Sequence, residues 1–248
     1  MNLLLLRQGE LGPDGTARLT GRRLLHAQEV LKAQRGDALR VGVLDGELGT
    51  GEVLSLDPAA LVLRVSLGAQ PPPRAGVDLL LALPRPKALK KILPALASFG
   101  AGRIVLLNAA RVERSFFSSP VLEPAALEEL LCLGLEQARD TRLPEVMLRE
   151  RFRPFVEDEL DALFAGQPVR LLAHPGAPPL RSVLPARPPA AAAPAAPLLL
   201  AIGPEGGWVP FELALLGARG FAPVSLGARP LRTEVAVSAL LGALAALR

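Results

Sequence analysis

The sequence predicts an α/β protein in which a small N-terminal β-barrel precedes a C-terminal part with a mostly parallel sheet. Before residue 70, short apolar segments are separated by turn residues, which is typical of a small β-structure. After residue 70, short apolar segments alternate with segments of helical spacing, which is typical of parallel strands joined by helices. The chain has 248 residues and half of them are hydrophobic, so a sizeable core can form.

The first 70 residues are expected to form the barrel. Strands are predicted at residues 2–6, 38–44, 51–56 and 60–67, with turns at Asp45-Gly46 and Asp57-Pro58. Apolar residues at helical spacing between residues 21 and 33 predict one short helix. Pro71 to Pro73 forms a stiff connector. We therefore expect one domain at residues 1–70 and a second at residues 71–248.

The elements of the second domain follow from the same patterns. Apolar strands are predicted at residues 77–83, 103–108, 169–173, 198–202 and 223–226. Helices are predicted at residues 87–99, 122–138, 210–218 and 233–247, and an Ala/Pro-rich loop at 186–197. The last helix is nearly all apolar, although a surface helix normally has a polar face. We expect domain core to cover one side of it and a second copy of the chain to cover another.

The composition argues against several classes of protein. Cys132 is the only cysteine, so no intramolecular disulfide can form. His26 and His174 are the only histidines, so a zinc site built from His and Cys is not expected. The first residues lack the basic region of a secretory signal, and prolines interrupt the longest uncharged run, residues 188–204. We expect a cytoplasmic protein that does not enter a membrane.

Positive charge gathers in residues 71–114. This segment has eight basic and two acidic side chains, a net charge of +6, whereas the whole chain has a net charge of +4. Such a segment can contact a polyanion, and the alternative is an ordinary solvated helix face. The side chains proposed for this contact are Arg85, Lys87, Lys90, Lys91 and Arg114.

Three loops follow predicted strands and are expected to carry the chemistry. They are residues 171–176, 202–208 and 226–234. Open α/β sheets bind ligands at the carboxyl ends of their strands. Gly203, Gly206 and Gly207 let the backbone turn sharply and approach a ligand closely. The sequence has no Walker A or G-x-G-x-x-G motif, and His174 has no pattern of triad partners around it.

Two of these loops carry long motifs. The second loop reads Ile202-Gly203-Pro204-Glu205-Gly206-Gly207, and the third reads Leu226-Gly227-x-Arg229-x-Leu231-Arg232-Thr233-Glu234. Together they closely resemble the RsmE family, the ribosomal small-subunit RNA (uracil-N3) methyltransferases of the knotted SPOUT superfamily. Leu44-Asp45-Gly46, Leu83-Pro84-Arg85, Glu136-Gln137 and Arg142-Leu143-Pro144-Glu145 fall in the order of that family. The chain departs from the family pattern at Pro94, Ala95, Ser98 and Asp140, which leaves the exact RNA target open.

The resemblance implies a PUA-like, RNA-binding N-terminal barrel and a SPOUT domain whose trefoil knot lies at roughly residues 198–231. It also implies S-adenosylmethionine (SAM) in the knot, a homodimer, and RNA as the polyanion. The implied cofactor residues are Leu172, His174, Ile202, Gly203, Pro204, Glu205, Gly206, Gly207, Leu226, Gly227, Leu231 and Thr233.

Several of these residues have a structural alternative. Leu172, Ile202, Leu226 and Leu231 are also typical core residues, although an adenine ring needs an apolar slot of this kind. His174 can be an ordinary loop histidine, and Glu205 can cap the next helix. Trp208 is interpreted as core or dimer packing rather than as a platform for a base.

Arg232 and Glu234 are the predicted catalytic residues. Methyl transfer to uracil N3 needs the lone pair of that nitrogen, so the ring must lose its N3 proton before or during attack. A guanidinium near the ring stabilises the developing anion. The alternative is a structural cap in which Glu234 binds backbone amides. No metal is needed, because the sulfonium is already an activated electrophile.

These expectations give one main interpretation and two alternatives. The main one is a SAM-dependent RNA methyltransferase acting at N3 of a uridine in small-subunit (16S) rRNA. The alternatives are a catalytically silent RNA-binding SPOUT paralogue and a methyltransferase for another RNA position. The intact Leu231-Arg232-Thr233-Glu234 sequence argues against the silent paralogue.

Overall fold

The computed structural model describes residues 3–166, 169–184 and 196–247 and divides into two compact units. The first unit comprises Met1–Pro73 together with Leu131–Leu143, and the second comprises Arg74–Leu130 and Pro144–Arg248. The sequence did not anticipate that residues 131–143 join the first unit. Most of the Ala/Pro-rich loop predicted at 186–197 lies outside the described residues.

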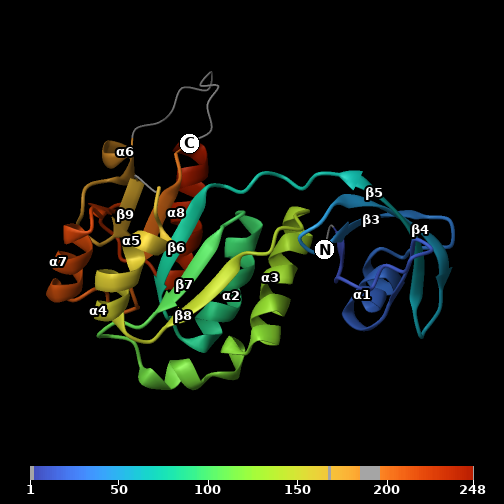
Figure 1. Ribbon diagram of the computed structural model, residues 1–248, viewed down its shortest axis with the longest axis horizontal. Coiled ribbons are helices and arrows are strands. Elements are labelled where there is room, and N and C mark those ends of the chain that lie inside the picture. Colours follow the sequence, from blue (N-terminus) through green and yellow to red (C-terminus); the bar gives the residue numbers. More distant parts are fainter. Residues whose placement is uncertain (1–2, 167–168, 185–195, 248) are drawn as a thin grey trace. The chain divides into compact units, whose positions relative to one another are not determined.

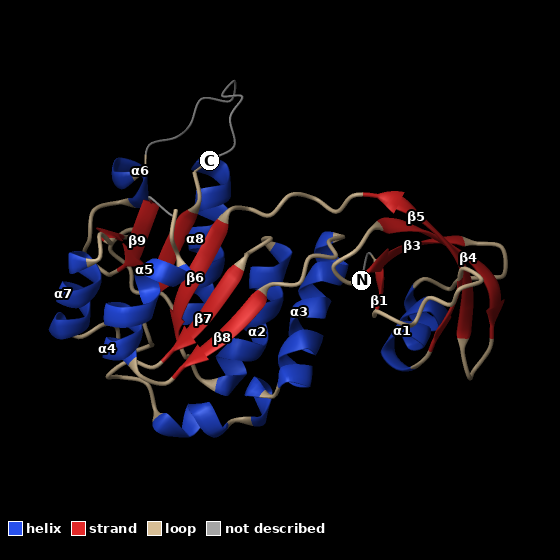
Figure 2. Ribbon diagram, viewed as in Figure 1, coloured by secondary structure: helices blue, strands red, loops and turns tan. Residues whose placement is uncertain are grey.

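The first unit contains a five-stranded sheet (Figure 2). Its strands are β1 (Leu4–Leu6), β2 (Thr16–Leu19), β3 (Ala38–Val43), β4 (Leu48–Leu56) and β5 (Leu61–Ala69), in the order β1-β3-β4-β5-β2. Only β1 and β3 pair in parallel, and the other pairs are antiparallel. One short helix, α1 (Gly21–Leu25), continues as a π-helical turn, η1 (His26–Val30). Leu6, Leu19, Leu61 and Leu63 are fully buried in the core of this unit.

Residues 140–143 complete the turn between β3 and β4. Asp45 adopts a φ of 56°, and its N–H donates to the carbonyl of Thr141 at 2.7 Å. The Thr141 hydroxyl donates to the carbonyl of Gly46 at 2.6 Å, and the N–H of Leu143 donates to the Asp45 carboxylate at 2.8 Å. The Asp140 carboxylate accepts from the N–H of Thr141 and of Arg142. Two motifs far apart in the sequence therefore form one structure, and Asp140 has a local structural role.

Glu136 also belongs to the first unit and is only 2% exposed. Its carboxylate accepts from both terminal nitrogens of Arg22, at 2.7 and 3.2 Å. This two-point ion pair fixes the end of α3 (Pro124–Ala138) on α1. The Glu136 carboxylate is therefore engaged in an intramolecular contact and is not exposed to solvent.

The second unit is built on a six-stranded sheet (Figure 1). Its strands are β6 (Val77–Ala82), β7 (Arg103–Leu107), β8 (Glu145–Arg149), β9 (Val169–Ala173), β10 (Leu198–Ile202) and β11 (Ala222–Val224). The order is β11-β9-β10-β6-β7-β8, and every pair is parallel. All residues of β6 and β10 are buried, as expected for the central strands of a parallel sheet. The predicted α/β class with a parallel sheet is confirmed.

Helices cover this sheet. They are α2 (Pro86–Ser98), α4 (Phe152–Pro154), α5 (Leu160–Leu163), α6 (Leu180–Val183), α7 (Pro210–Ala218) and α8 (Thr233–Leu247), with the start of α3. Three further turns are η2 (Arg114–Ser118), η3 (Pro120–Leu122) and η4 (Phe155–Glu159). In Figure 1, α2 and α8 lie side by side, and they pack against each other.

The sequence patterns did not predict β2, β8, α6, η2 or the helical turns between residues 152 and 163. Strand β2 is short and half polar, and β8 is an edge strand whose residues are all at least partly exposed. Neither has the apolar run that identified the central strands, because an edge strand is covered on fewer sides. All the strands and helices that the sequence predicted are present, and their ends differ from the predicted ends by up to three residues.

Candidate functional site

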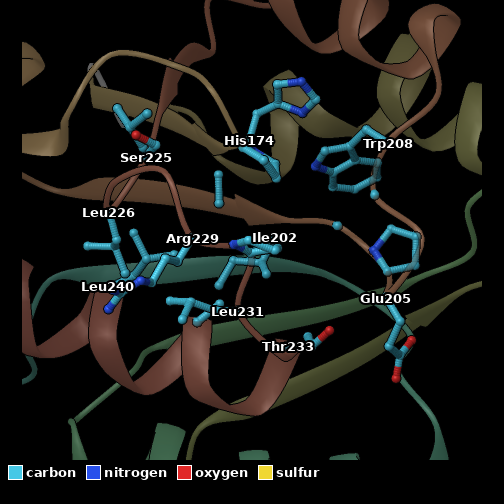
Figure 3. Close-up of a pocket in the computed structure, with 18 of the residues that line it drawn as sticks. His174, Ile202, Glu205, Trp208, Ser225, Leu226, Arg229, Leu231, Thr233 and Leu240 are labelled. Atoms are coloured by element: carbon cyan, nitrogen blue, oxygen red, sulfur yellow. The ribbon is translucent and has the colours of Figure 1, made fainter.

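A pocket lies at the carboxyl ends of β9, β10 and β11 and is closed by the start of α8 (Figure 3). Its volume is about 800 Å³, including the part that is open to solvent. The three loops that the sequence singled out therefore meet in one place, as expected for parallel strands. The predicted residues that line the pocket are His174, Ile202, Gly203, Pro204, Glu205, Gly207, Leu226, Gly227, Leu231 and Thr233.

Four predicted residues are outside the lining. Leu172 is 3% exposed inside β9, where it lies opposite Ala201 of β10. Gly206 faces Arg111, because a Cβ on this glycine would come within 2.8 Å of the Arg111 Cδ. Arg232 is exposed and Glu234 is half-buried at the start of α8, next to the lining residues Leu231 and Thr233.

One wall of the pocket is the loop at residues 203–209, which we call the anchored loop. The Arg111 guanidinium donates to the carbonyl of Gly206, and Arg85 donates from its backbone N–H and its Nε to the Glu205 carboxylate, both at 3.3 Å. Arg85 and Arg111 both come from the basic segment 71–114. The basic segment thus holds the loop that carries the glycine motif.

Glu212 fixes the far end of the anchored loop. This carboxylate is 2% exposed and accepts from the N–H of Ala110 at 2.7 Å and the N–H of Val209 at 3.0 Å. Through Val209 it caps the N-terminus of α7. The sequence had considered Glu205 for this capping role, and the structure assigns it to Glu212 instead.

The opposite wall is the loop at residues 226–232, which we call the open loop. Leu226 and Leu231 are 41% and 44% exposed. Within the described residues, no hydrogen bond or ion pair involves residues 228–231, and the guanidinium of Arg232 has no partner. The carbonyl of Arg232 accepts from Val235 and Ala236 and so begins α8. The open loop is therefore held only at its two ends.

Two polar atoms of the pocket are buried without a partner. They are Nδ1 of His174 and Nε1 of Trp208, neither of which has a hydrogen-bond partner in the described part of the chain. Buried polar groups of folded proteins are nearly always hydrogen-bonded. The two unpartnered nitrogens and the aliphatic side chains of Ile202, Leu231 and Leu240 suit a ligand that has an apolar ring and hydrogen-bonding groups.

The residues predicted to contact a polyanion are all exposed in the second unit. Lys87, Lys90 and Lys91 lie on α2 at spacings of three and four residues, so they share one face of the helix. No ion pair of these three lysines is found within the described residues. Arg114 starts η2, and Arg85 is bound to Glu205.

The sequence analysis missed several lining residues. Ala236 and Leu240 follow Thr233 by three and seven positions, so helical spacing places them on the same face of α8. Extending the motif along the predicted helix would have found them. Arg229 belonged to the third motif, but it was not assigned to the cofactor. Trp208 was interpreted as packing, since an indole gives no sequence signal for an unsatisfied N–H.

Comparisons with known proteins agree on one family. The model of an RNA methyltransferase domain matches residues 71–245. Ribosomal RNA small subunit methyltransferase E of Treponema pallidum is 30% identical, with 96% of this chain and 88% of the relative aligned. The protein of the same name from Synechocystis is 32% identical over 94% of this chain and 74% of its own length. The chain belongs to the RsmE family of RNA methyltransferases.

A solved RsmE has the same fold. The structure of the Neisseria gonorrhoeae protein, which was solved bound to S-adenosyl methionine, superposes with a TM-score of 0.72 over 98% of this chain and 96% of that one. At 19% identity this likeness concerns the fold alone. The resemblance drawn from the two loop motifs is confirmed by the RsmE relatives.

The described residues show neither a metal-binding cluster nor a membrane-spanning helix. No group of three or more His, Cys, Asp or Glu side chains is arranged to hold a metal ion there. None of the helices in that part of the chain has the length and apolar character needed to cross a bilayer.

Proposed function

We propose that this RsmE-family chain is a SAM-dependent methyltransferase that modifies N3 of a uridine in small-subunit rRNA. The observation that carries the proposal is the pocket itself. The two family motifs and the loop after β9 form it together at the carboxyl ends of three parallel strands. The relatives named in the comparisons are small-subunit rRNA methyltransferases, and the N. gonorrhoeae structure contains SAM.

The residues of the pocket fit this cofactor. Aliphatic side chains from both walls provide an apolar slot for an adenine ring. Nδ1 of His174 and Nε1 of Trp208 are buried and have no hydrogen-bond partner in the described residues. A bound ligand can supply these partners. Gly207 adopts a φ of 74° and nothing lies within 4 Å of the Cβ position, so the backbone is open to a ligand there. These residues would hold the cofactor, which supplies a methyl group already activated on a sulfonium.

The end of the open loop and the start of α8 carry the residues proposed for the chemical step, Arg232 and Glu234. Uracil N3 must lose its proton before it can accept a methyl group. The unpartnered guanidinium of Arg232 would stabilise the developing uracil anion, and the half-buried carboxylate of Glu234 would accept the proton. Within the described residues the Glu234 carboxylate accepts no hydrogen bond, so it does not cap α8 as the alternative required.

Binding and transfer experiments test this proposal. Calorimetry with SAM is expected to show binding without added metal. Methyl transfer is then measured on rRNA and on assembled small subunits, and the product base is identified by mass mapping. Absence of SAM binding at millimolar ligand would overturn the proposal. Binding without transfer would favour the silent paralogue, and transfer to another base would favour the third interpretation.

RNA contact is proposed for the exposed basic residues Arg85, Lys87, Lys90, Lys91 and Arg114, together with the first unit as a PUA-like domain. Replacing Lys90 and Lys91 by Glu exchanges two positive charges on α2 for two negative ones. RNA affinity should fall, and the slope of its logarithm against log salt should decrease by about 2, since each phosphate contact contributes roughly 0.9. SAM affinity should not change. An unaltered salt slope would mean that this face is only solvated.

We further propose that the second unit is a SPOUT domain with a trefoil knot at roughly residues 198–231, and that the protein is a cytoplasmic homodimer. In α8 the apolar residues Val235, Ala239, Ala245 and Ala246 are exposed. A helix that is apolar on nearly all sides needs cover beyond its own domain core, which supports a second copy of the chain there. Light scattering at low micromolar concentration should give the dimer mass, and a strict monomer would contradict this part.

A further inference from the structure

Trp208 lines the pocket, and the proposed function does not say which group of the cofactor its indole N–H would bind. It is 4% exposed, and its Nε1 is buried without a partner in the described residues. An indole N–H can only donate a hydrogen bond, so it cannot be satisfied by another donor. A buried donor of this kind calls for an acceptor that comes with a ligand.

The ring of Trp208 is held in place from two sides. A Cβ on Gly203 would come 3.0 Å from Nε1 and 3.1 Å from Cδ1, so the indole lies close against the Gly203 backbone and a larger residue there would press on it. The ring of Phe152 packs against the indole with 5.9 Å between centroids and an angle of 50°. The donor is therefore oriented before any ligand arrives, which lowers the cost of forming a hydrogen bond with it.

We propose that the Trp208 Nε1–H donates a hydrogen bond to an uncharged acceptor on the adenosine part of the cofactor. This inference rests on the proposed function and adds a specificity-determining residue to it. The acceptor is assigned to the adenosine part because the indole is neutral and lies within a mostly apolar site. Among the described lining residues, Arg229 carries the permanent positive charge, and it lies on the opposite side of the pocket from Trp208 in Figure 3. A guanidinium is the better partner for the carboxylate of the methionine part.

The chain offers a direct readout of this hydrogen bond. Trp208 is its only tryptophan, so the ¹⁵N-labelled protein gives a single indole N–H resonance that needs no assignment. SAM and adenosine are each expected to move the indole proton downfield and to slow its exchange with solvent about tenfold or more. Methionine alone is expected to do neither.

A pair of variants tests the contribution to binding. Trp208→Phe keeps an aromatic ring but removes the donor, and should weaken binding of both SAM and adenosine about tenfold. Phe152→Leu removes the ring that packs on the indole but keeps the donor, so the ligand-induced indole shift should persist. Thermal unfolding of both variants is followed alongside.

The outcomes separate this inference from the proposed function. If the wild-type protein binds SAM and the indole resonance does not respond, Trp208 is not the donor and the proposed function stands. If methionine alone moves the resonance, the acceptor is on the methionine part of the cofactor, which contradicts this inference. If the protein does not bind SAM at all, both proposals fail. Should Trp208→Phe not fold, the wild-type titration decides the question alone.

Discussion

The two loops that face each other across the pocket differ in how the second unit supports them. The anchored loop, residues 203–209, is bound by Arg85 and Arg111, and its far end is fixed by the buried carboxylate of Glu212. The open loop, residues 226–232, has no comparable contact within the described residues between Gly227 and the carbonyl of Arg232. A site that binds the same cofactor in every cycle gains from a preorganised wall. A side chain that acts on a substrate must be free of partners within the protein. The Arg232 guanidinium of the open loop meets this requirement in the described residues.

The largest effect is expected at Arg232, in the open loop. Arg232→Ala should slow methyl transfer about 100- to 1,000-fold, the typical loss when a group that stabilises a developing anion is removed. Because its guanidinium has no partner in the described residues, folding and SAM affinity should be nearly unchanged. Single-turnover rates with saturating RNA measure the effect.

Two further variants are controls for Arg232→Ala. Arg232→Lys should restore only part of the rate, because a point ammonium cannot replace the planar guanidinium. Arg229→Ala, which alters a lining residue, should weaken SAM binding more than it slows transfer. Turnover of Arg232→Ala within a few-fold of wild type would make Arg232 structural, and the anion would need another stabilising group.

The second effect concerns Glu212, which fixes the anchored loop. Glu212→Ala leaves the N–H groups of Ala110 and Val209 without their acceptor inside the protein. The free energy of unfolding of the second unit should fall by about 2–4 kcal/mol, since hydrogen bonds to a buried charge are among the stronger ones. Denaturant titration measures this. Glu212→Gln keeps one carbonyl acceptor and should lose less, whereas equal losses for the two variants would argue that packing, not hydrogen bonding, is responsible.

A smaller effect is expected at the contact between Gly206 and Arg111. Gly206→Ala should displace the Arg111 side chain, because the new Cβ would lie 2.8 Å from its Cδ, and weaken SAM binding several-fold. The cause is this contact and not the backbone, since Gly206 is not among the glycines with positive φ. Arg111→Ala should give a similar loss by calorimetry. The double variant should lose no more than either single one, and full additivity would show that the two residues act independently.

The smallest effect concerns acid stability near β9. Hydrogen bonds from Arg170 and then Arg219 hold the pKa of Asp161 below its ordinary value of 3.8. Because the folded-state pKa is lowered, this contribution is present above about pH 4 and is lost as the pH falls through the folded-state pKa. Asp161 is half exposed, so Asp161→Asn should cost less than about 1 kcal/mol at neutral pH. Urea unfolding at pH 7 and pH 3 should show the difference between variant and wild type shrinking in acid, and a constant difference would exclude this ion cluster as its source.

The central part of the fold could be predicted from the sequence, and the edges could not. β10 is an uninterrupted apolar run and β6 is apolar except for Asp78, because both strands are covered on both faces, so their positions are evident from composition alone. β8 lies at the edge of its sheet and carries charged residues at both ends, and its pattern differs little from that of a loop. The hydrophobic pattern of a segment depends on how far that segment is buried, so the pattern is weak for strands that are only partly buried.

The candidate site shows the same limit. The loop motifs located the pocket because glycines and proline mark sharp turns after strands. The contacts that support those loops were not predicted, because Glu212 and Arg111 meet the anchored loop through the fold and not through sequence spacing. Similarly, the capping role that was the alternative for Glu205 belongs to Glu212, the third residue of α7.

The return of residues 131–143 to the first unit has a consequence for the order of events during synthesis. When Pro73 leaves the ribosome, the β3–β4 turn still lacks Thr141, which accepts from the N–H of Asp45 and donates to the carbonyl of Gly46. At about 5–20 residues per second, residue 143 follows after several seconds. The first unit can therefore collapse early but cannot complete its native contacts until the Arg74–Leu130 part of the second unit has been translated. A fragment ending at Pro73 should be less stable than the same residues in the full chain.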